Sequence, residues 1–363
     1  MPGRAAPCRF ADNGTMTSDR DAASAAPGAF GAGEADAIAA VQERYGRFAR
    51  DEAPGRSDVY EAWASGVERD DRAALLLSRI PATRRQPPLV FAITRLLGAP
   101  LGAFGPWAKW LDAHIDALVA ESARRGLQTN EPLRCAALLP ALATIDGPLA
   151  LLELGASAGL CLYPDRYSYR YSGARDAALD PVDGPSPVVL ESELRGPRAG
   201  DTPLRMPEIV WRAGVDLAPL DATDAADRRF LTTLVWPGET GRAQRIDAAL
   251  DIVAADPPRI VRGDVADPGV LDPLIASAPA DATLVITTPG VLPYVPRARR
   301  ERLVESLTRG PAVWITIDPP SLHEAWHPAV DREQWRGFVL ARDARPLADV
   351  DPLGGFVEWR AGE

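Results

Sequence analysis

The stretch LLELGASAG, residues 151–159, combines an acidic residue with a loop of small residues. An apolar run ends at Glu153-Leu154, and small side chains fill the five positions that follow. Small residues let a ligand approach the backbone closely, and the start of a following helix offers free N–H groups to an anion. A carboxylate at the strand end, that of Glu153, can bind an ammonium group or a hydroxyl. The spacing is neither G-x-G-x-x-G nor a P-loop, because the P-loop lysine is absent.

Written as E-x-G-x-x-x-G, this loop resembles motif I of the class I S-adenosylmethionine-dependent methyltransferases. Ser157 stands where many members of that group have a glycine. The resemblance implies that S-adenosylmethionine is the cofactor and that these residues of the loop bind it: Glu153, Gly155, Ala156, Ser157 and Gly159. The alternative is a strand-to-helix turn whose small residues serve packing alone.

The same resemblance implies two further acids, each placed after a later strand. An acid that ends the second strand binds the ribose hydroxyls in that group, and IVWRAGVDL supplies Asp216. An acid after the third strand lies near the adenine, and RIVRGDVAD supplies Asp264. Each aspartate taken singly is equally compatible with a loop or a helix cap, so their order along the chain carries the argument.

Three longer segments resemble the bacterial DUF2332 family. They are QTNEPLRCAALLPAL, LLELGASAGLCLYPDRYSYRY and GVDLAPLDATDAADRRFLTTLVWPGETGRAQRIDAAL, in this order along the chain. The name denotes a domain of unknown function, and the resemblance extends from near residue 40 to the C-terminus. It implies a class I methyltransferase-like fold preceded by a helical part, and it transfers no catalytic residue.

Four further residues are candidates for substrate binding. Asn130, Glu131 and Arg134 directly precede the cofactor strand and either line the mouth of the site or serve the fold. In the second interpretation Asn130 caps the next helix and Glu131 favours its first turn. Tyr294 lies in the loop after TLVITTPG, and in methyltransferases of this class the corresponding loop faces the substrate. The catalytic residue remains unassigned.

The segment HEAWH, residues 323–327, is a literal H-E-x-x-H. In zinc hydrolases this pattern places both histidines on one helical face and uses the glutamate as general base. Here Pro328 follows at once and disfavours helix at His327. We therefore assign no metal site and keep a zinc-dependent hydrolase as the least favoured function. A substrate-facing histidine and a plain surface turn are the other interpretations.

Hydrophobic periodicity divides the chain into regions that must position these residues. Residues 35–147 carry apolar side chains at three- and four-residue steps, which predicts an all-helical region. In residues 148–363 short apolar runs alternate with helical patterns, which predicts a Rossmann-like α/β domain of the methyltransferase type. An insertion with its own hairpin is expected at about 163–205, and an antiparallel pair near the C-terminus. Residues 1–34 have the composition of a disordered segment.

Composition limits the classes of partner. The 363 residues carry 40 Lys and Arg against 50 Asp and Glu, which gives a net charge of −10. An acidic balance argues against nucleic acid as the main partner, because phosphates need a basic footprint. The sequence shows neither a membrane span nor the apolar core of a signal peptide. Three cysteines without metal-type spacing fit a reducing compartment. We expect a cytoplasmic protein with a small-molecule substrate.

These expectations combine into one leading function and one main alternative. The leading function is a methyltransferase-like protein that binds S-adenosylmethionine and acts on a small molecule. In-line displacement at the sulfonium methyl depends mostly on positioning, at times with a general base. The alternative is a catalytically inactive regulatory protein on the same fold that binds a cofactor or nucleotide. Ser157 and the lack of an obvious base, such as an N-P-P-Y motif, keep this alternative open.

Overall fold

The computed structural model describes residues 32–323 and 326–361 and forms two compact units. Of the described residues, the first unit comprises those up to 128 together with 229–243. The second comprises the described residues of 129–228 and of 244–361. The sequence predicted that the helical region ends at residue 147, whereas the first unit ends at residue 128. The two boundaries differ because the helix before the first strand packs with the sheet. Most of the segment expected to be disordered lies outside the described residues, and the first helix begins at Ala32.

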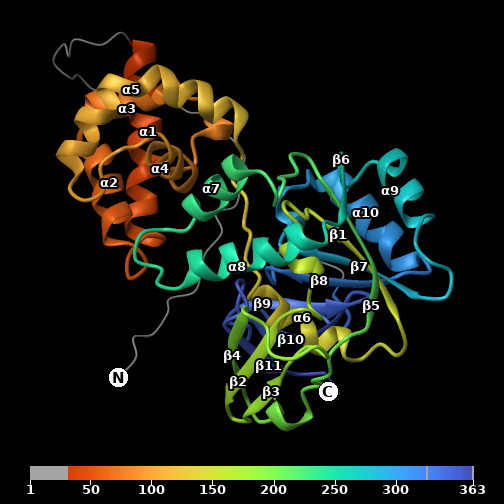
Figure 1. Cartoon of the computed structure of the whole chain (residues 1–363). Helices are drawn as coiled ribbons and strands as arrows, with labels where there is room; N and C mark the ends of the chain where they lie inside the picture. The colour runs from red at the N-terminus through yellow and green to blue at the C-terminus, as the bar shows by residue number, and fades with distance from the viewer. Residues whose placement is uncertain (1–31, 324–325, 362–363) are drawn as a thin grey trace. The chain divides into compact units, whose positions relative to one another are not determined.

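The first unit is the helical region expected from the periodicity of the sequence (Figure 1). Its helices are α1 (Ala32–Asp51), α2 (Asp58–Arg69), α3 (Asp71–Ser78), η1 (Ala82–Arg84), α4 (Pro87–Leu96) and α5 (Phe104–Arg124). The Ser57 hydroxyl caps α2 by accepting a hydrogen bond from the Tyr60 amide at 3.3 Å, which supplies a partner that the first turn otherwise lacks. The core is aromatic: Phe91 makes ring contacts with Tyr60, Trp63 and Trp107.

The segment 229–243 is held within the first unit by arginines. The Arg95 guanidinium donates to the Tyr60 hydroxyl at 2.9 Å and to the carbonyls of Thr233 at 2.9 Å and Val235 at 2.7 Å. The Arg56 guanidinium lies 3.7 Å from the ring centroid of Trp236. The chain that leaves the sheet unit after residue 228 is therefore fixed by polar contacts that start on α4 and on the loop before α2.

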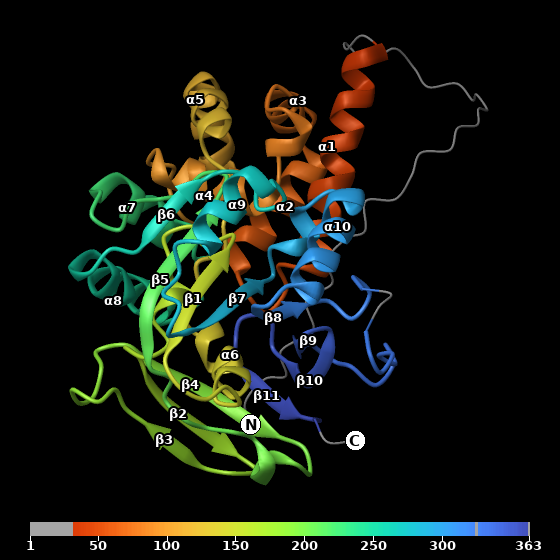
Figure 2. The same ribbon diagram turned by 90° about the vertical axis from the view of Figure 1, so that its right-hand side faces the viewer.

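The second unit is built on one sheet of eleven strands (Figure 2). The strands are β1 (Leu149–Leu154), β2 (Ser168–Gly173), β3 (Ala177–Leu179), β4 (Val189–Arg195), β5 (Ile209–Asp216), β6 (Arg259–Arg262), β7 (Thr283–Pro289), β8 (Val313–Asp318), β9 (Phe338–Arg342), β10 (Arg345–Val350) and β11 (Phe356–Trp359). Their order across the sheet is β3-β2-β4-β11-β10-β9-β8-β7-β1-β5-β6. The prediction of a mixed α/β protein with a helical N-terminal region and a mostly parallel sheet is confirmed.

The five strands β6, β5, β1, β7 and β8 are all parallel. β9, β10 and β11 continue the sheet in antiparallel fashion. The segment 163–205 contains an antiparallel β2–β3 pair, and it is not a separate insertion, because β4 pairs with β11 and so joins the same sheet. The strands at the far edge of the sheet, β2, β3 and β4, therefore come from the part of the sequence between β1 and β5.

Helices and short 3-10 turns occur between these strands along the chain. They are α6 (Arg134–Leu142), η2 (Leu160–Leu162), η3 (Ala199–Asp201), α7 (Ala225–Thr233), α8 (Arg242–Ala255), α9 (Pro268–Ile275), η4 (Leu292–Tyr294) and α10 (Arg297–Arg309). The helix expected after β1 is short: it consists of the three-residue 3-10 helix η2. Pro164 follows closely, and a proline restricts the residue before it and ends a helix.

Strand β1 is buried along its whole length. Leu152 and Leu154 belong to a core cluster with Leu271 of α9 and Leu303 of α10. Successive side chains of a strand point to opposite faces, so Glu153 points away from that cluster. On the second face α6 contacts β4, β8 and β9. The acid of β1 is therefore enclosed between the sheet and its covering elements.

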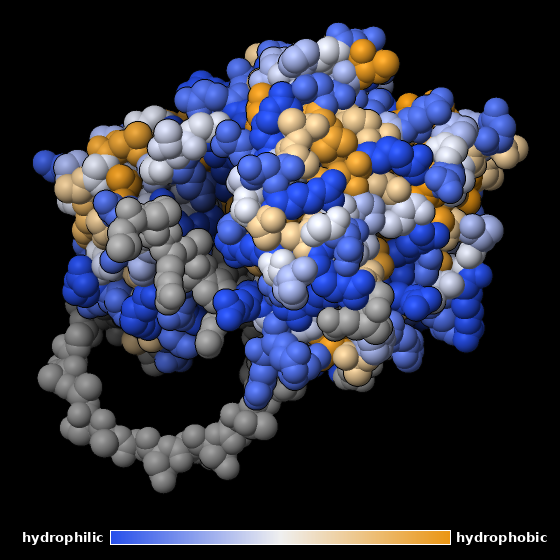
Figure 3. Space-filling view, turned by 90° about the horizontal axis from the view of Figure 1, so that it is seen from below, coloured by the Kyte–Doolittle hydropathy of each residue, from blue (hydrophilic) through white to orange (hydrophobic). Residues whose placement is uncertain are grey.

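The outer surface is mixed in character. On the face drawn in Figure 3, hydrophobic residues lie in separate groups between hydrophilic ones. Within the described part of the chain, no helix combines the length and the hydropathy needed to cross a bilayer.

The contacts of Arg95 generate a prediction about stability. Arg95→Ala removes the donor from the carbonyls of Thr233 and Val235, and an unsatisfied half-buried acceptor costs about 1–3 kcal/mol. We expect the thermal unfolding midpoint, followed by far-UV circular dichroism, to fall by about 4–8 °C. The control is Arg47→Ala, an exposed arginine of α1, for which we expect a change within about 2 °C. Equal midpoints for the two variants would contradict this role.

Candidate functional site

The order of the parallel strands reverses between β1 and β7. From β1 the chain builds outward through β5 to β6, and then returns to the other side of β1 with β7 and β8. In open α/β sheets, ligands bind outside the carboxyl ends of the strands at such a reversal. Glu153, Asp216 and Asp264 lie at or just after the ends of β1, β5 and β6. This edge is the candidate site.

The loop after β1 has an unusual backbone. Gly155, Ser157 and Gly159 all have positive φ, of 79°, 52° and 80°. A Cβ at Gly155 would lie 2.5 Å from Val291 in the loop after β7, so only glycine fits there. Serine rarely adopts a positive φ, and such strain persists only where surrounding contacts fix it. The loop is therefore held by specific interactions.

Asp216 and Asn130 supply those interactions. One carboxylate oxygen of Asp216 accepts from the Ser157 amide at 2.8 Å, and the other accepts from the Ala218 amide at 2.8 Å. The Asn130 side chain donates to the Ser157 hydroxyl at 2.7 Å and accepts from the Ala158 amide at 3.4 Å. Asn130 thus joins the loop, and the residue at the N-cap of α6 is Leu133. Polar groups that could face a phosphate are bound by the chain itself.

Glu131 and Arg134 are buried beside this loop. Glu131 is 1% exposed, and its carboxylate accepts from the Leu133 amide and from the Arg245 side chain, both at 3.0 Å. The Arg134 guanidinium donates to the carbonyl of Pro289, at the end of β7, at 3.0 Å. It also donates to the carbonyl of Pro352, between β10 and β11, at 2.9 Å. Both side chains therefore fix the site's framework.

Glu153 differs from its neighbours, because part of its carboxyl group has no partner. It is 4% exposed, and the register places it beside Gly214 of β5 and Thr287 of β7. Its Oε2 and the Thr287 hydroxyl are buried and find no hydrogen-bond partner among residues 32–323 and 326–361. Burial raises the pKa of Glu153 well above its usual value, Cys161 and Asp216 act in the same direction, and Arg134 opposes them. Perturbed acids of this kind cluster at functional sites.

The remaining two predicted residues are Asp264 and Tyr294. Asp264 follows β6, and its carboxylate accepts from the Ala266 amide at 2.8 Å and pairs with Arg299 at 2.6 Å. The preceding Gly263 donates its amide to the Asp216 carbonyl at 2.9 Å, so the ends of β5 and β6 lie together. Tyr294, in η4, is 62% exposed. The structure thus brings Asp216 and Asn130 to the loop after β1, and it brings Arg134 and Asp216 close enough to Glu153 to affect its pKa.

Two residues near the candidate site, Cys161 and Arg245, were not predicted as site residues from the sequence. The thiol of Cys161 donates to the Glu131 carbonyl at 3.6 Å, and a hydrogen bond from Cys135 lowers the pKa of Cys161. Arg245 pairs with a glutamate 114 positions earlier, although its spacing from Arg242 favours a solvated helix face. Chain topology, which no local pattern reveals, makes both contacts.

The HEAWH segment has a different geometry from that of a zinc site. Residues 321–323 and 326–330 are not helical, so the two histidines do not share a helix face, and Glu324 lies outside the described residues. His323 lies 3.3 Å from the carboxylate of Asp318 and packs edge-on against Trp326. His327 is exposed. In the described part of the chain, no group of three or more potential ligand side chains could hold a metal ion.

Of the comparisons with known proteins, the comparison with protein-family models found a match. Neither a curated protein nor a solved structure matches the chain. The model of a family described as "Uncharacterized protein conserved in bacteria (DUF2332)" matches residues 98–359. That range includes the whole sheet unit from Thr129 to β11 and every candidate site residue. Because the match covers more than half of the sequence, the chain belongs to the DUF2332 family.

Proposed function

We propose that this protein binds S-adenosylmethionine at the carboxyl edge of β1, β5 and β6 and transfers its methyl group to a small molecule. The observation that carries the proposal is the buried Oε2 of Glu153, which has no partner in the described residues. A buried carboxyl oxygen without a partner is costly. A cationic ligand would supply the missing interaction.

The strand order supports this proposal. Counted along the chain, β1, β5, β6, β7 and β8 form the order 3-2-1-4-5 that Rossmann-like sheets share. Glu153 is the penultimate residue of the first of these strands and Asp216 the last residue of the second, at the reversal where such sheets bind nucleotide cofactors. The residues expected from the methyltransferase motifs are thus compatible with one site.

The donor set is chemically suited to this cofactor. S-adenosylmethionine carries an ammonium group and a sulfonium ion, and a carboxylate is the natural partner of a cation. Asp216 accepts two backbone hydrogen bonds, and a carboxylate has about four acceptor positions. It therefore keeps the capacity to accept hydrogen bonds from ribose hydroxyls. The sulfonium methyl is the electrophile, and the protein supplies position and exclusion of water.

The loop after β1 differs from the expected cofactor-binding loop in two ways, and these differences limit which groups of the protein can bind the cofactor. η2 has three residues, so the loop lacks a long helix whose N-terminus would bind an anion. The hydroxyl of Ser157 is bound by Asn130. Recognition in this proposal therefore rests on carboxylates, and it suits a cationic cofactor better than a phosphate. The overall acidic charge, −10, also favours a small-molecule acceptor over nucleic acid.

Substitution of Glu153 tests the proposal. Glu153→Gln removes the charge that would pair with the cation, and we expect the dissociation constant for S-adenosylmethionine to rise about 10- to 100-fold. The measurement is isothermal titration calorimetry. The matched control is Glu208→Gln, an exposed glutamate directly before β5, which we expect to bind as the unsubstituted protein does. Equal affinities for all three proteins, or no binding by any, would refute the proposed site.

Stability measurements separate lost binding from lost folding. Because burial raises the pKa of Glu153, the folded protein holds a proton that the unfolded chain releases, and its stability falls as pH rises between the two pKa values. Glu153→Gln removes this pH-dependent penalty. We expect the ligand-free variant to unfold at the same or a higher temperature at neutral pH. A lower midpoint would show that the acid stabilises the fold, which contradicts this prediction.

The pH dependence of affinity is a further prediction. A cation binds the ionised form of Glu153, whereas the free protein favours the protonated form. At pH values below the raised pKa, binding of the cation must therefore release the proton of Glu153. The affinity should increase with pH until that pKa is passed. Calorimetric titrations across a pH series check this slope, and Glu153→Gln should lose it. An affinity that is independent of pH in the unsubstituted protein would contradict the role of this carboxyl.

Turnover distinguishes the two functions that share this site. Release of S-adenosylhomocysteine in the presence of a small-molecule acceptor supports the methyltransferase. Tight binding without release across acceptor classes supports the catalytically inactive regulatory protein expected as the alternative.

A further inference from the structure

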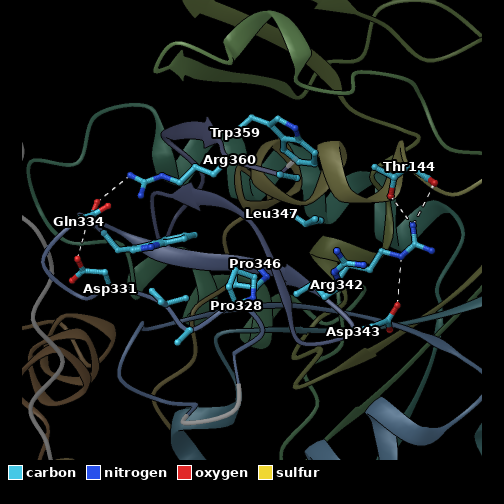
Figure 4. Close-up of a pocket in the computed structure, with 15 residues that line it drawn as sticks. Thr144, Pro328, Asp331, Gln334, Arg342, Asp343, Pro346, Leu347, Trp359 and Arg360 are labelled. Carbon is cyan, nitrogen blue, oxygen red and sulfur yellow. Dashed lines mark hydrogen bonds and ion pairs between the residues drawn. The ribbon is translucent and has the colours of Figure 1, made fainter. Parts of the chain in front are cut away.

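A cavity of about 540 Å³ lies over the C-terminal strands of the sheet unit (Figure 4). Its lining comes from the β9–β10 turn, the end of β11, the segment 328–335 and Thr144, the second residue after α6. It includes none of the residues of the candidate site described above. Its volume falls within the range of about 300–1,000 Å³ typical of small-molecule pockets.

The middle of the cavity is apolar. Pro346 and Leu347 lie between a group formed by Gln334 and Arg360 on one side and a group formed by Thr144 and Arg342 on the other (Figure 4). Two tryptophans, Trp335 and Trp359, also line it. Tryptophan rings bind flat apolar groups through their faces, so this lining suits an aromatic or similarly flat molecule.

The polar part of the lining is charged. Three arginines, Arg342, Arg345 and Arg360, and two acids, Asp331 and Asp343, line the cavity. Arg342 pairs with Asp343 at 3.5 Å and Arg360 with Glu358 at 3.0 Å, so Arg345 is the lining arginine without an acidic partner among the described residues. The two carboxylates of the lining would repel a dianion, so the lining favours an anion that carries a single charge.

Two of the three arginines have partners. Arg360 donates to the Gln334 carbonyl and the Glu358 carboxylate, both at 3.0 Å, and lies 4.7 Å from the centroid of the Trp335 ring. Arg342 donates to the Thr144 hydroxyl at 3.0 Å. Both therefore form fixed walls of the cavity.

Arg345 is the arginine that remains available. It is exposed, and within residues 32–323 and 326–361 no hydrogen bond or ion pair is found for its guanidinium. An arginine carries five N–H donors in a planar fork, which matches a carboxylate in a two-point contact. The position of Arg345 at the start of β10, two residues before Leu347, places this fork beside the apolar lining.

We propose that this cavity is a second ligand site, which binds a small aromatic molecule bearing one carboxylate. The carboxylate pairs with Arg345, and the ring packs against Leu347, Pro346 and the tryptophans. The inference does not rest on the proposed function. The cofactor proposed above is a cation that binds carboxylates at other residues, whereas this ligand is an anion that binds arginine.

The test uses fluorinated aromatic acids of one and two rings, 4-fluorobenzoate and 6-fluoro-2-naphthoate, each with its neutral carboxamide. Binding to the full chain is measured by ¹⁹F NMR line broadening. We expect at least one acid to bind with a dissociation constant below about 1 mM. Its carboxamide should bind at least about tenfold more weakly, because it lacks the charge that pairs with the guanidinium.

Three variants locate the binding. Arg345→Ala should weaken the acid about tenfold or more, and Leu347→Trp, which fills the cavity without changing its charge, should do the same. The matched control is Arg332→Ala, an exposed arginine of the neighbouring segment that does not line the cavity. It removes the same charge and should change the affinity less than about twofold.

Three results would overturn the inference. One is the failure of both acids to bind. The second is equal binding of acid and carboxamide. The third is an affinity that Arg345→Ala and Arg332→Ala reduce equally, because that result would assign binding to overall charge and not to this cavity.

Discussion

The central constraint on this protein is the burial of β1 on both faces. Five of its six residues are apolar and pack against covering elements, and the remaining one, Glu153, holds a carboxyl group that is almost as deeply buried. Ionising an acid there is costly unless a positive charge compensates it. Arg134 is the nearby cation, but the two hydrogen bonds of its guanidinium go to backbone carbonyls. The sheet therefore keeps an acid that its own described side chains only partly neutralise.

The loop that follows β1 depends on side chains from two other parts of the chain. Asp216 arrives from the end of β5 and Asn130 from the segment before α6, and together they bind the Ser157 amide, the Ser157 hydroxyl and the Ala158 amide. These contacts stabilise a positive φ at Ser157, which serine alone would avoid. The edge of the sheet is thereby preorganised, since its loop is fixed before a ligand arrives. Preorganised sites lose less entropy on binding.

Local sequence patterns predicted the helical and α/β regions, but they did not predict which strands pair or which side chains meet across long stretches of sequence. The change from helical periodicity to alternating runs gave both regions, and the acids at the ends of β5 and β6 were found by their order after β1. The pairing of β4 with β11 was missed, because it depends on where the chain goes after Pro164. The hydrogen bond from Arg134 to the Pro352 carbonyl joins residues 218 positions apart in the sequence, and no periodic pattern predicts it. The cavity at Arg345 likewise forms only when the C-terminal strands pair.

The most direct test of the account is a titration of the Glu153 carboxyl group itself. In protein labelled with ¹³C at glutamate side-chain carboxyls, and with the Glu153 signal assigned by its loss in Glu153→Gln, NMR gives the pKa with and without S-adenosylmethionine. The account predicts a pKa well above the ordinary glutamate value in the free protein and a clear fall when the cation binds. An ordinary pKa in the free protein, or a raised pKa that saturating cofactor leaves unchanged, would contradict it.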